Sequence, residues 1–267
     1  MAATGATVNA PAPENPELVI RKLNERTTIF SAPFARFGLI PIGGRSTAIK
    51  LEDDSLWVVP STALTPATLT ALQELAGQGP GVRHLVTIDR EHNIFVPQYI
   101  KAFPEAKVYV PSGVKDSWTK DASKKDLVDK ITFVFGQGKG DPFEAVTNGE
   151  IKTVDFGKSH GNEVSPMRRQ TDPLINSPSI QDVAFLHTPT KTLIQADLMF
   201  NLPPTEQYSK SSKRSWFPIL SGQFTAEGAG HKRLLNMIAK DKSEYAKDVI
   251  EHGGKGIWNN LYAKFLQ

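Results

Sequence analysis

The sequence contains no cysteine, which excludes disulfide bonds and thiolate metal sites and gives no sign of an oxidising compartment. An excess of one charge is also missing. Lys and Arg total 31 against 28 Asp and Glu, a formal net charge of +3. This excess is too small to argue for nucleic acid, and there is no long basic run. We therefore expect no nucleic-acid partner.

Long apolar runs are missing as well. None approaches the ~18 residues that a membrane span needs, and the first sixteen residues lack the basic start and apolar centre of a signal peptide. We expect a cytoplasmic protein with no membrane partner and a flexible tail over residues 1–17. Hydrophobic residues make up 39% of the chain and charged residues 22%, enough apolar material for a single domain over residues 18–267.

The hydrophobic spacing changes along the chain from a strand pattern to a mixed one. A helix is predicted between Thr65, a good N-cap, and Gly77, a good terminator. The strand, helix, strand order over residues 82–110 predicts a βαβ unit with parallel strands. Helical patterns also occur over residues 231–240 and at the carboxyl end. The candidate strands cover residues 27–30, 37–40, 46–51, 56–59, 85–88, 107–110, 131–135, 151–156, 182–186 and 192–194.

The buried strand over residues 85–88 is followed at once by Asp89, Glu91 and His92, three side chains that can bind metal. A strand that ends in such a loop is a common way to build a site at the carboxyl edge of a sheet. A solvated turn between strand and helix is the alternative, and these residues alone leave it open.

Three further polar positions stand at or near the ends of candidate strands: His160, Asp197 and His252. His160 and His252 are each followed by glycine, and Asp197 ends the hairpin over residues 182–197. Together with the stretch Thr87-Ile88-Asp89-Arg90-Glu91-His92, this order resembles the metallo-β-lactamase superfamily, whose main motif is HxHxDH after a buried strand. The resemblance covers roughly residues 38–254. It implies an αββα sandwich, in which two mixed β-sheets lie between layers of helices.

The same resemblance implies two metal sites, with Asp197 bridging them. One would consist of Glu91, His92, Asp197 and His252, and the other would keep Asp89, His160 and Asp197. The sequence departs from the motif at Thr87, Asp89 and Glu91, which replace two histidines and an aspartate. One or two divalent ions are expected, zinc first, with iron or manganese as alternatives because carboxylates replace imidazoles.

A metal-dependent hydrolase is the first hypothesis for function. A metal-bound water with a pKa of roughly 7 would attack an ester, lactone, thioester or phosphodiester in a small molecule. Asp89 and Asp197 would be the catalytic carboxylates. The polar stretch over residues 201–223 is long enough to be a mobile lid, and its basic and aromatic side chains suggest an anionic substrate. The sequence leaves the oligomeric state open.

A binding or regulatory protein that kept the fold and lost the metal is the second hypothesis, motivated by Thr87 and the other departures. A di-iron redox protein is a third. The remaining histidines, His84, His187 and His231, are interpreted as structural residues, with a place in the lining of the site as the alternative for His231.

Overall fold

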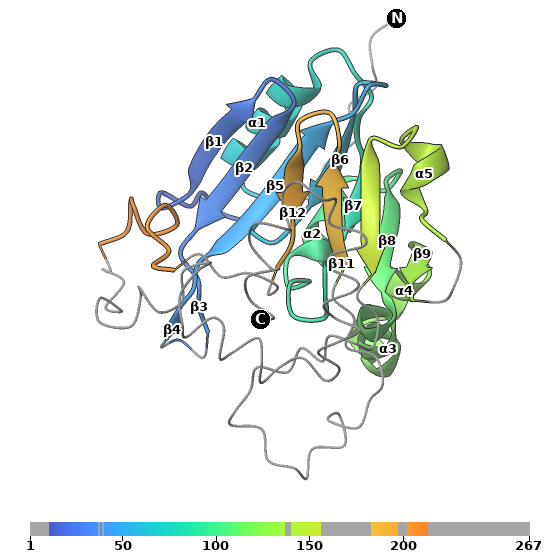
Figure 1. Ribbon diagram of the computed structural model, residues 1–267. Coiled ribbons are helices and arrows are strands. Elements are labelled where there is room, and N and C mark those ends of the chain that lie inside the picture. The colour runs from blue at the N-terminus through green and yellow to red at the C-terminus, as the bar shows by residue number, and fades with distance from the viewer. Residues whose placement is uncertain are drawn as a thin grey trace, which may run out of the picture.

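The computed structural model describes residues 11–36, 38, 40–136, 140–155, 183–196 and 202–212. Figure 1 shows a large twisted sheet crossed by a smaller one, with α1 and α2 behind the large sheet. The large sheet has seven strands in the order β1-β2-β5-β6-β7-β8-β9, and the small sheet has three in the order β10-β11-β12. The strands are β1 (Val19–Asn24), β2 (Thr27–Ala32), β3 (Ala35–Arg36), β4 (Ile40–Pro41), β5 (Gly44–Lys50), β6 (Ser55–Val59), β7 (Gly81–Val86), β8 (Lys107–Pro111), β9 (Ile131–Phe135), β10 (Ile151–Asp155), β11 (Val183–His187) and β12 (Thr192–Ile194).

The large sheet is mixed. Strands β1, β2, β5 and β6 pair antiparallel as a meander, and β6, β7, β8 and β9 pair parallel. The change follows the connections. Short turns join β1 to β2 and β5 to β6, and the hairpin of β3 and β4 lies between β2 and β5, whereas α1, α2 and then α3 with α4 lie in the crossovers that the parallel strands require. The predicted βαβ unit over residues 82–110 is confirmed. The carboxyl ends of β7 and β8 therefore lie at one edge of the sheet.

The helices of the described chain are short, and the first three cover one face of the large sheet. Thr65 caps α1 by accepting from the amide of Thr68, and Gly77 ends this helix at φ 62°, where glycine carries no steric cost. Both predicted ends are confirmed. The helical elements are α1 (Pro66–Ala76), α2 (Val96–Ala102), α3 (Ser112–Lys120), the 3-10 turn η1 (Ala122–Lys124), α4 (Lys125–Val128) and α5 (Phe143–Val146).

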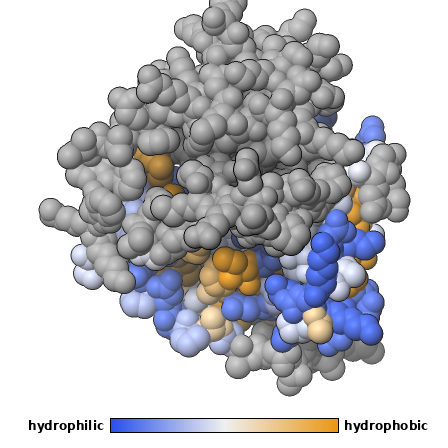
Figure 2. All heavy atoms as spheres, turned by 90° about the horizontal axis from the view of Figure 1, so that it is seen from below, coloured by the Kyte–Doolittle hydropathy of each residue, from blue (hydrophilic) through white to orange (hydrophobic). Residues whose placement is uncertain are grey.

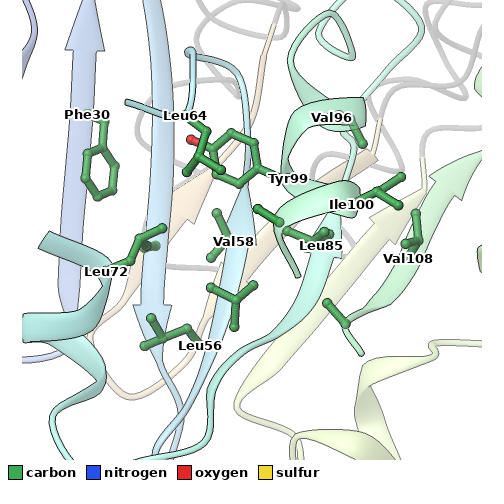
Figure 3. Close-up of a cluster of buried hydrophobic side chains, with 14 of the residues drawn as sticks. Phe30, Leu56, Val58, Leu64, Leu72, Leu85, Val96, Tyr99, Ile100 and Val108 are labelled. Atoms are coloured by element: carbon green, nitrogen blue, oxygen red, sulfur yellow. The ribbon is translucent and has the colours of Figure 1, made fainter. Parts of the chain in front are cut away.

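Consecutive residues of the central strands point to opposite faces of the large sheet, and both faces are buried. On β6, Leu56 and Val58 join the core beneath the helices, whereas Trp57 and Val59 join the core beneath the small sheet. Figure 3 shows the helix-side core, with Leu72 of α1 and Tyr99 of α2 facing the strands. Burial on both faces explains why these strands are continuous apolar runs in the sequence.

The second core lies between the two sheets and is rich in aromatic rings. Trp57 meets Phe143 and Phe185 edge to face, at centroid distances of 6.0 and 5.1 Å. Phe185 comes from β11, so these contacts fix the small sheet on the large one. The two sheets with helices on the outer face confirm the predicted α/β sandwich. The helices predicted over residues 231–240 and at the carboxyl end lie outside the described residues.

Two local predictions need correction. Of the strand expected over residues 37–40, residue 38 lies in a turn and Ile40 begins β4, which pairs with β3 as a two-residue ladder, and residues 37 and 39 lie outside the described residues. Helix α3 was not predicted, because its sequence Ser112–Lys120 is mostly polar and only Val114 and Trp118 supply buried apolar side chains. Within the described residues, no helix is long and apolar enough to span a membrane.

Candidate functional site

The candidate site begins where β7 ends, between the two sheets. The amide of Thr87 donates to the carbonyl of Tyr109 on β8 at 3.0 Å, and the Thr87 hydroxyl reaches the same oxygen at 3.4 Å. The next carbonyl, of Ile88, accepts from the amide of Val183 at the start of β11 at 3.1 Å. Residues 87 and 88 are thus held by both sheets, and the buried Thr87 side chain is bonded within the protein.

Asp89 directly follows residues 87 and 88 and is buried, with only 3% of its surface exposed. Its Oδ1 accepts from the amides of Glu91 and His92 at 2.6 and 2.8 Å, which closes the turn. Its Oδ2 lies 2.7 Å from Nδ1 of His92. Burial raises the pKa of Asp89, but the charge and hydrogen bonds of His92 outweigh it and leave the pKa below its usual range.

His92 is positioned by this carboxylate. Because Nδ1 is bonded to Asp89, the other ring nitrogen, Nε2, is directed away from the turn. A carboxylate on one imidazole nitrogen fixes the tautomer and raises the basicity of the other, as it does for many metal-binding histidines. The His92 side chain is 32% exposed.

A second set of contacts braces the turn from α3. The side-chain amide of Asn93 donates to the carbonyl of Arg90, and Nε1 of the buried Trp118 donates to Oδ1 of Asn93 at 3.1 Å. Sequence reasoning missed Trp118, which lies 25 residues from Asn93 on a helix that the polar pattern concealed. These contacts connect the position of His92 to the packing of α3.

A cavity of about 340 Å³ opens beside His92. It lies at the end of the molecule to which β7 and β8 point, the lower end in Figure 1, where α3 follows β8. Figure 2 views this end and shows, among the described residues, a small hydrophobic area bordered by hydrophilic ones. The cavity is lined by Arg21, Ile42, Gly43, Gly44, Arg45, Ser61, Ile88, His92, Gln195, Ala196, Leu202, Pro203, Thr205, Glu206 and Gln207.

Two charged groups of the large sheet meet the segment of residues 202–212 in the wall of this cavity. Nη2 of Arg21 lies 2.6 Å from Oε2 of Glu206, and Nη2 of Arg45 lies 3.7 Å from Oε1. The hydroxyl of Ser31 donates to Oε1 at 2.8 Å. Sequence reasoning missed this cluster, because Arg21 and Glu206 are 185 positions apart and no motif marks either residue.

The predicted metal ligands are only partly visible in this arrangement. The structure brings Asp89, Glu91 and His92 together in one turn, with the Glu91 side chain exposed. His160, Asp197 and His252 lie outside the described residues. Ala196, the residue before Asp197, lines the same cavity as His92. Within the described residues, no cluster of three or more potential ligands could hold a metal ion.

The residues expected to be structural behave so where they are described. His84 is buried, with Nδ1 3.2 Å from the Tyr109 hydroxyl, and burial lowers its pKa to about 4. His187 is also buried, bonded through Nδ1 to Thr190 at 2.7 Å, and burial lowers its pKa to about 4 as well. Neither lines the cavity. His231 lies outside the described residues.

Comparison with solved structures identifies the class of fold. The metallo-β-lactamase DIM-1 aligns with a TM-score of 0.51 at 12% identity, over 89% of this chain and 85% of that one. DIM-1 exposed to ceftazidime gives the same TM-score at 11% identity and the same coverage. The metallo-β-lactamase TMB-1 gives 0.51 at 9% identity, over 88% and 84%. At these identities the likeness shows the fold, which is that of the metallo-β-lactamases.

The family is identified by sequence. Residues 38–213 match the model of a family described as a domain of unknown function, DUF4336, and the chain belongs to that family. A search of curated proteins finds no match to the chain.

Proposed function

We propose that this protein is a metal-dependent hydrolase acting on a small molecule in the cavity beside His92. One observation carries the proposal: a histidine oriented by a buried carboxylate stands at the carboxyl end of a central strand and faces a cavity. The metallo-β-lactamase fold supports the proposal. So does the resemblance of residues 87–92 to the HxHxDH motif, in which His92 occupies the last position. The chain from β12 reaches the same cavity at Ala196.

The donor chemistry of the described residues fits a metal at His92. Its Nε2 is the nitrogen that binding would use, and Asp89 would hold the ring in place. Asp197, one residue beyond Ala196, is the proposed carboxylate ligand, with Glu91 and His252 completing the set that the resemblance assigns to the ion at His92. Zinc accepts such a set, and iron or manganese are the alternatives. A divalent ion there would acidify a water molecule and polarise a carbonyl or phosphoryl group.

We propose one ion rather than two. The resemblance assigns positions 87 and 89 to a second site, but here both serve the fold. The Thr87 hydroxyl is bonded to Tyr109, and both oxygens of Asp89 are bonded to the turn and to His92. Asp89 therefore acts as a positioning residue, and Asp197 is left as the carboxylate nearest the chemistry.

A hydrolysis assay tests this function. The wild type, reconstituted with zinc, iron or manganese, is offered an ester, a lactone, a thioester and a phosphodiester, with and without a chelator. We expect one of these to be hydrolysed, chelation to stop the reaction, and His92→Ala to abolish it. His84→Gln is the control, because it removes an imidazole from β7, the strand before the turn, away from the cavity. Equal rates for the wild type and His92→Ala would refute the site.

A binding protein that retains the fold without metal is the second candidate. The observation that favours it is the same use of Thr87 and Asp89 for internal hydrogen bonds. A wild type that retains no zinc, iron or manganese after reconstitution, and hydrolyses none of the four substrates, would favour this reading instead.

A further inference from the structure

The carboxylate of Glu206 is bound by arginine and serine side chains, the kind of groups that bind a free anion. It accepts from Arg21 and Ser31 and faces Arg45, whose Nε in turn donates to Ser31 at 3.1 Å. Burial raises the pKa of Glu206, but the hydrogen bonds from Arg21 and Ser31 and the two positive charges outweigh it, so the net pKa is lowered. The group is therefore ionised at neutral pH.

This contact lies in the cavity that His92 lines. Arg21, Arg45 and Glu206 all belong to the cavity wall, so the two guanidinium groups border the space that a substrate would enter. Among the described residues, Glu206 is the one carboxylate bonded to these two arginines. Guanidinium groups match the geometry of phosphate as well as that of carboxylate, and a dianion would balance both charges.

The segment that carries Glu206 has other attachments, which do not depend on its charge. The Tyr208 hydroxyl donates to the carbonyl of Phe34 at 2.9 Å, and Nζ of Lys210 donates to the carbonyl of Leu18 at 2.9 Å. Gly43 also approaches Gln207 so closely that an added Cβ would lie 2.5 Å from its Cγ. The Glu206 side chain could therefore leave the arginines while the segment stays attached.

We propose that Arg21, Arg45 and Ser31 form a binding site for a phosphate group of the substrate, and that Glu206 fills this site until the phosphate displaces it. The proposal deepens the proposed function by naming the substrate class, a phosphorylated small molecule whose scissile bond would reach His92. It rests on that function for the reaction, but the binding site itself requires no metal.

Calorimetric titration with inorganic phosphate at pH 8 and low ionic strength tests the site. Removing the competing charge with Glu206→Gln keeps the side-chain shape, and we expect it to tighten phosphate binding at least about five-fold, the lower end of ordinary coupling between ligands. Arg45→Gln added to Glu206→Gln should abolish this gain. Low salt is needed because the arginines are partly exposed and screening weakens their attraction.

Tyr208→Phe is the matched control, because it loosens the same segment without changing a charge. It should bind phosphate as the wild type does. Equal phosphate affinity in the wild type and Glu206→Gln would overturn the proposal, and so would a gain in Tyr208→Phe as large as that in Glu206→Gln. A gain for acetate as large as that for phosphate would overturn the assignment to phosphate.

Metal content separates this proposal from the proposed function. Glu206→Gln should retain the metal content of the wild type, because the carboxylate is bonded to arginines and a serine. If the phosphate gain is found and no metal binds, the anion site stands without the hydrolase. If metal binds at His92 and the gain is missing, the hydrolase stands and the anion site falls.

Discussion

At the scale of single residues, the pair Asp89 and His92 carries the account. If Asp89 orients His92, Asp89→Asn should keep the turn, since an amide oxygen can still accept from the amides of residues 91 and 92. Loss of the charge beside Nδ1 should weaken zinc affinity by about 10- to 100-fold, the usual cost of removing such a partner. Competition with a chromogenic chelator measures this affinity. Unchanged affinity in Asp89→Asn would contradict the positioning role.

The same residue predicts an acid dependence of stability. The folded-state pKa of Asp89 lies below the usual pKa of an aspartate, so its ionised form favours the native state. This contribution is present above the unfolded-state pKa and is lost as the pH falls through the folded-state pKa. The free energy of unfolding, measured by urea titration between pH 5 and 2, should therefore decline less steeply in Asp89→Asn than in the wild type. Parallel curves would contradict the sign.

Thr87 tests whether a missing motif residue can be restored. Its side chain is fully buried and bonded to the Tyr109 carbonyl, so Thr87→His forces a larger ring into a packed position. We expect destabilisation of about 1–3 kcal/mol, the ordinary cost of overpacking, with no gain in bound metal. Urea unfolding and metal analysis give the two readouts. A variant that is as stable as the wild type and binds a second ion would show that the two-metal site is only incomplete.

At the scale of elements, two buried histidines predict how stability depends on pH. His84 on β7 and His187 on β11 both have pKa values lowered to about 4, mainly by burial. The positive charges of Lys107 and Arg83 also lower the pKa of His84, and the negative charge of Asp53 raises it. The positive charge of Arg26 also lowers the pKa of His187. The unfolded chain binds these protons near pH 6.5, so stability is lost as the pH falls from about 6.5 to 4.

The experiment for this dependence compares urea unfolding of the wild type and His84→Gln at pH 7 and pH 5. The loss between the two values should be smaller in the variant, because one of the two buried imidazoles no longer takes up a proton on unfolding. Glu150, whose raised pKa reflects burial and whose Oε2 lies 3.5 Å from Nε2 of His187, makes His187 the less direct choice. Equal losses in the two proteins would show that His84 does not titrate on unfolding.

The elements also show what the sequence could predict. Strands with both faces buried are continuous apolar runs, and the Thr65 cap and Gly77 terminator bound α1, so local patterns were sufficient. Helix α3 could not be predicted from the local pattern, because its position depends on burying Trp118 against the turn at Asn93. The contact between Arg21 and Glu206 could not be predicted, because it joins parts of the chain that are distant in sequence. The potential metal ligands after β7 could be recognised in the sequence, but the hydrogen bond between Asp89 and His92 could not.

At the scale of the whole molecule, the segment over residues 202–212 connects the large sheet to the cavity. Several residues of this segment, which is the described part of the stretch 201–223, line the cavity. The predicted lid movement stays a prediction. Hydrogen exchange with and without zinc tests it: the backbone amides of residues 205–208 should exchange more slowly with zinc bound, because a lid that closes over the site protects its backbone. Uniform strong protection across the segment would argue against a lid.

The most direct test of the central claim is the metal content of the chain. Mass spectrometry of zinc-reconstituted protein, after removal of loosely bound ions, should find one ion per chain in the wild type. His92→Ala and Asp197→Ala should lose it, whereas the control His84→Gln should keep it. A wild type without metal, or a His92→Ala variant that retains as much as the wild type, would contradict a metal centre at the end of β7.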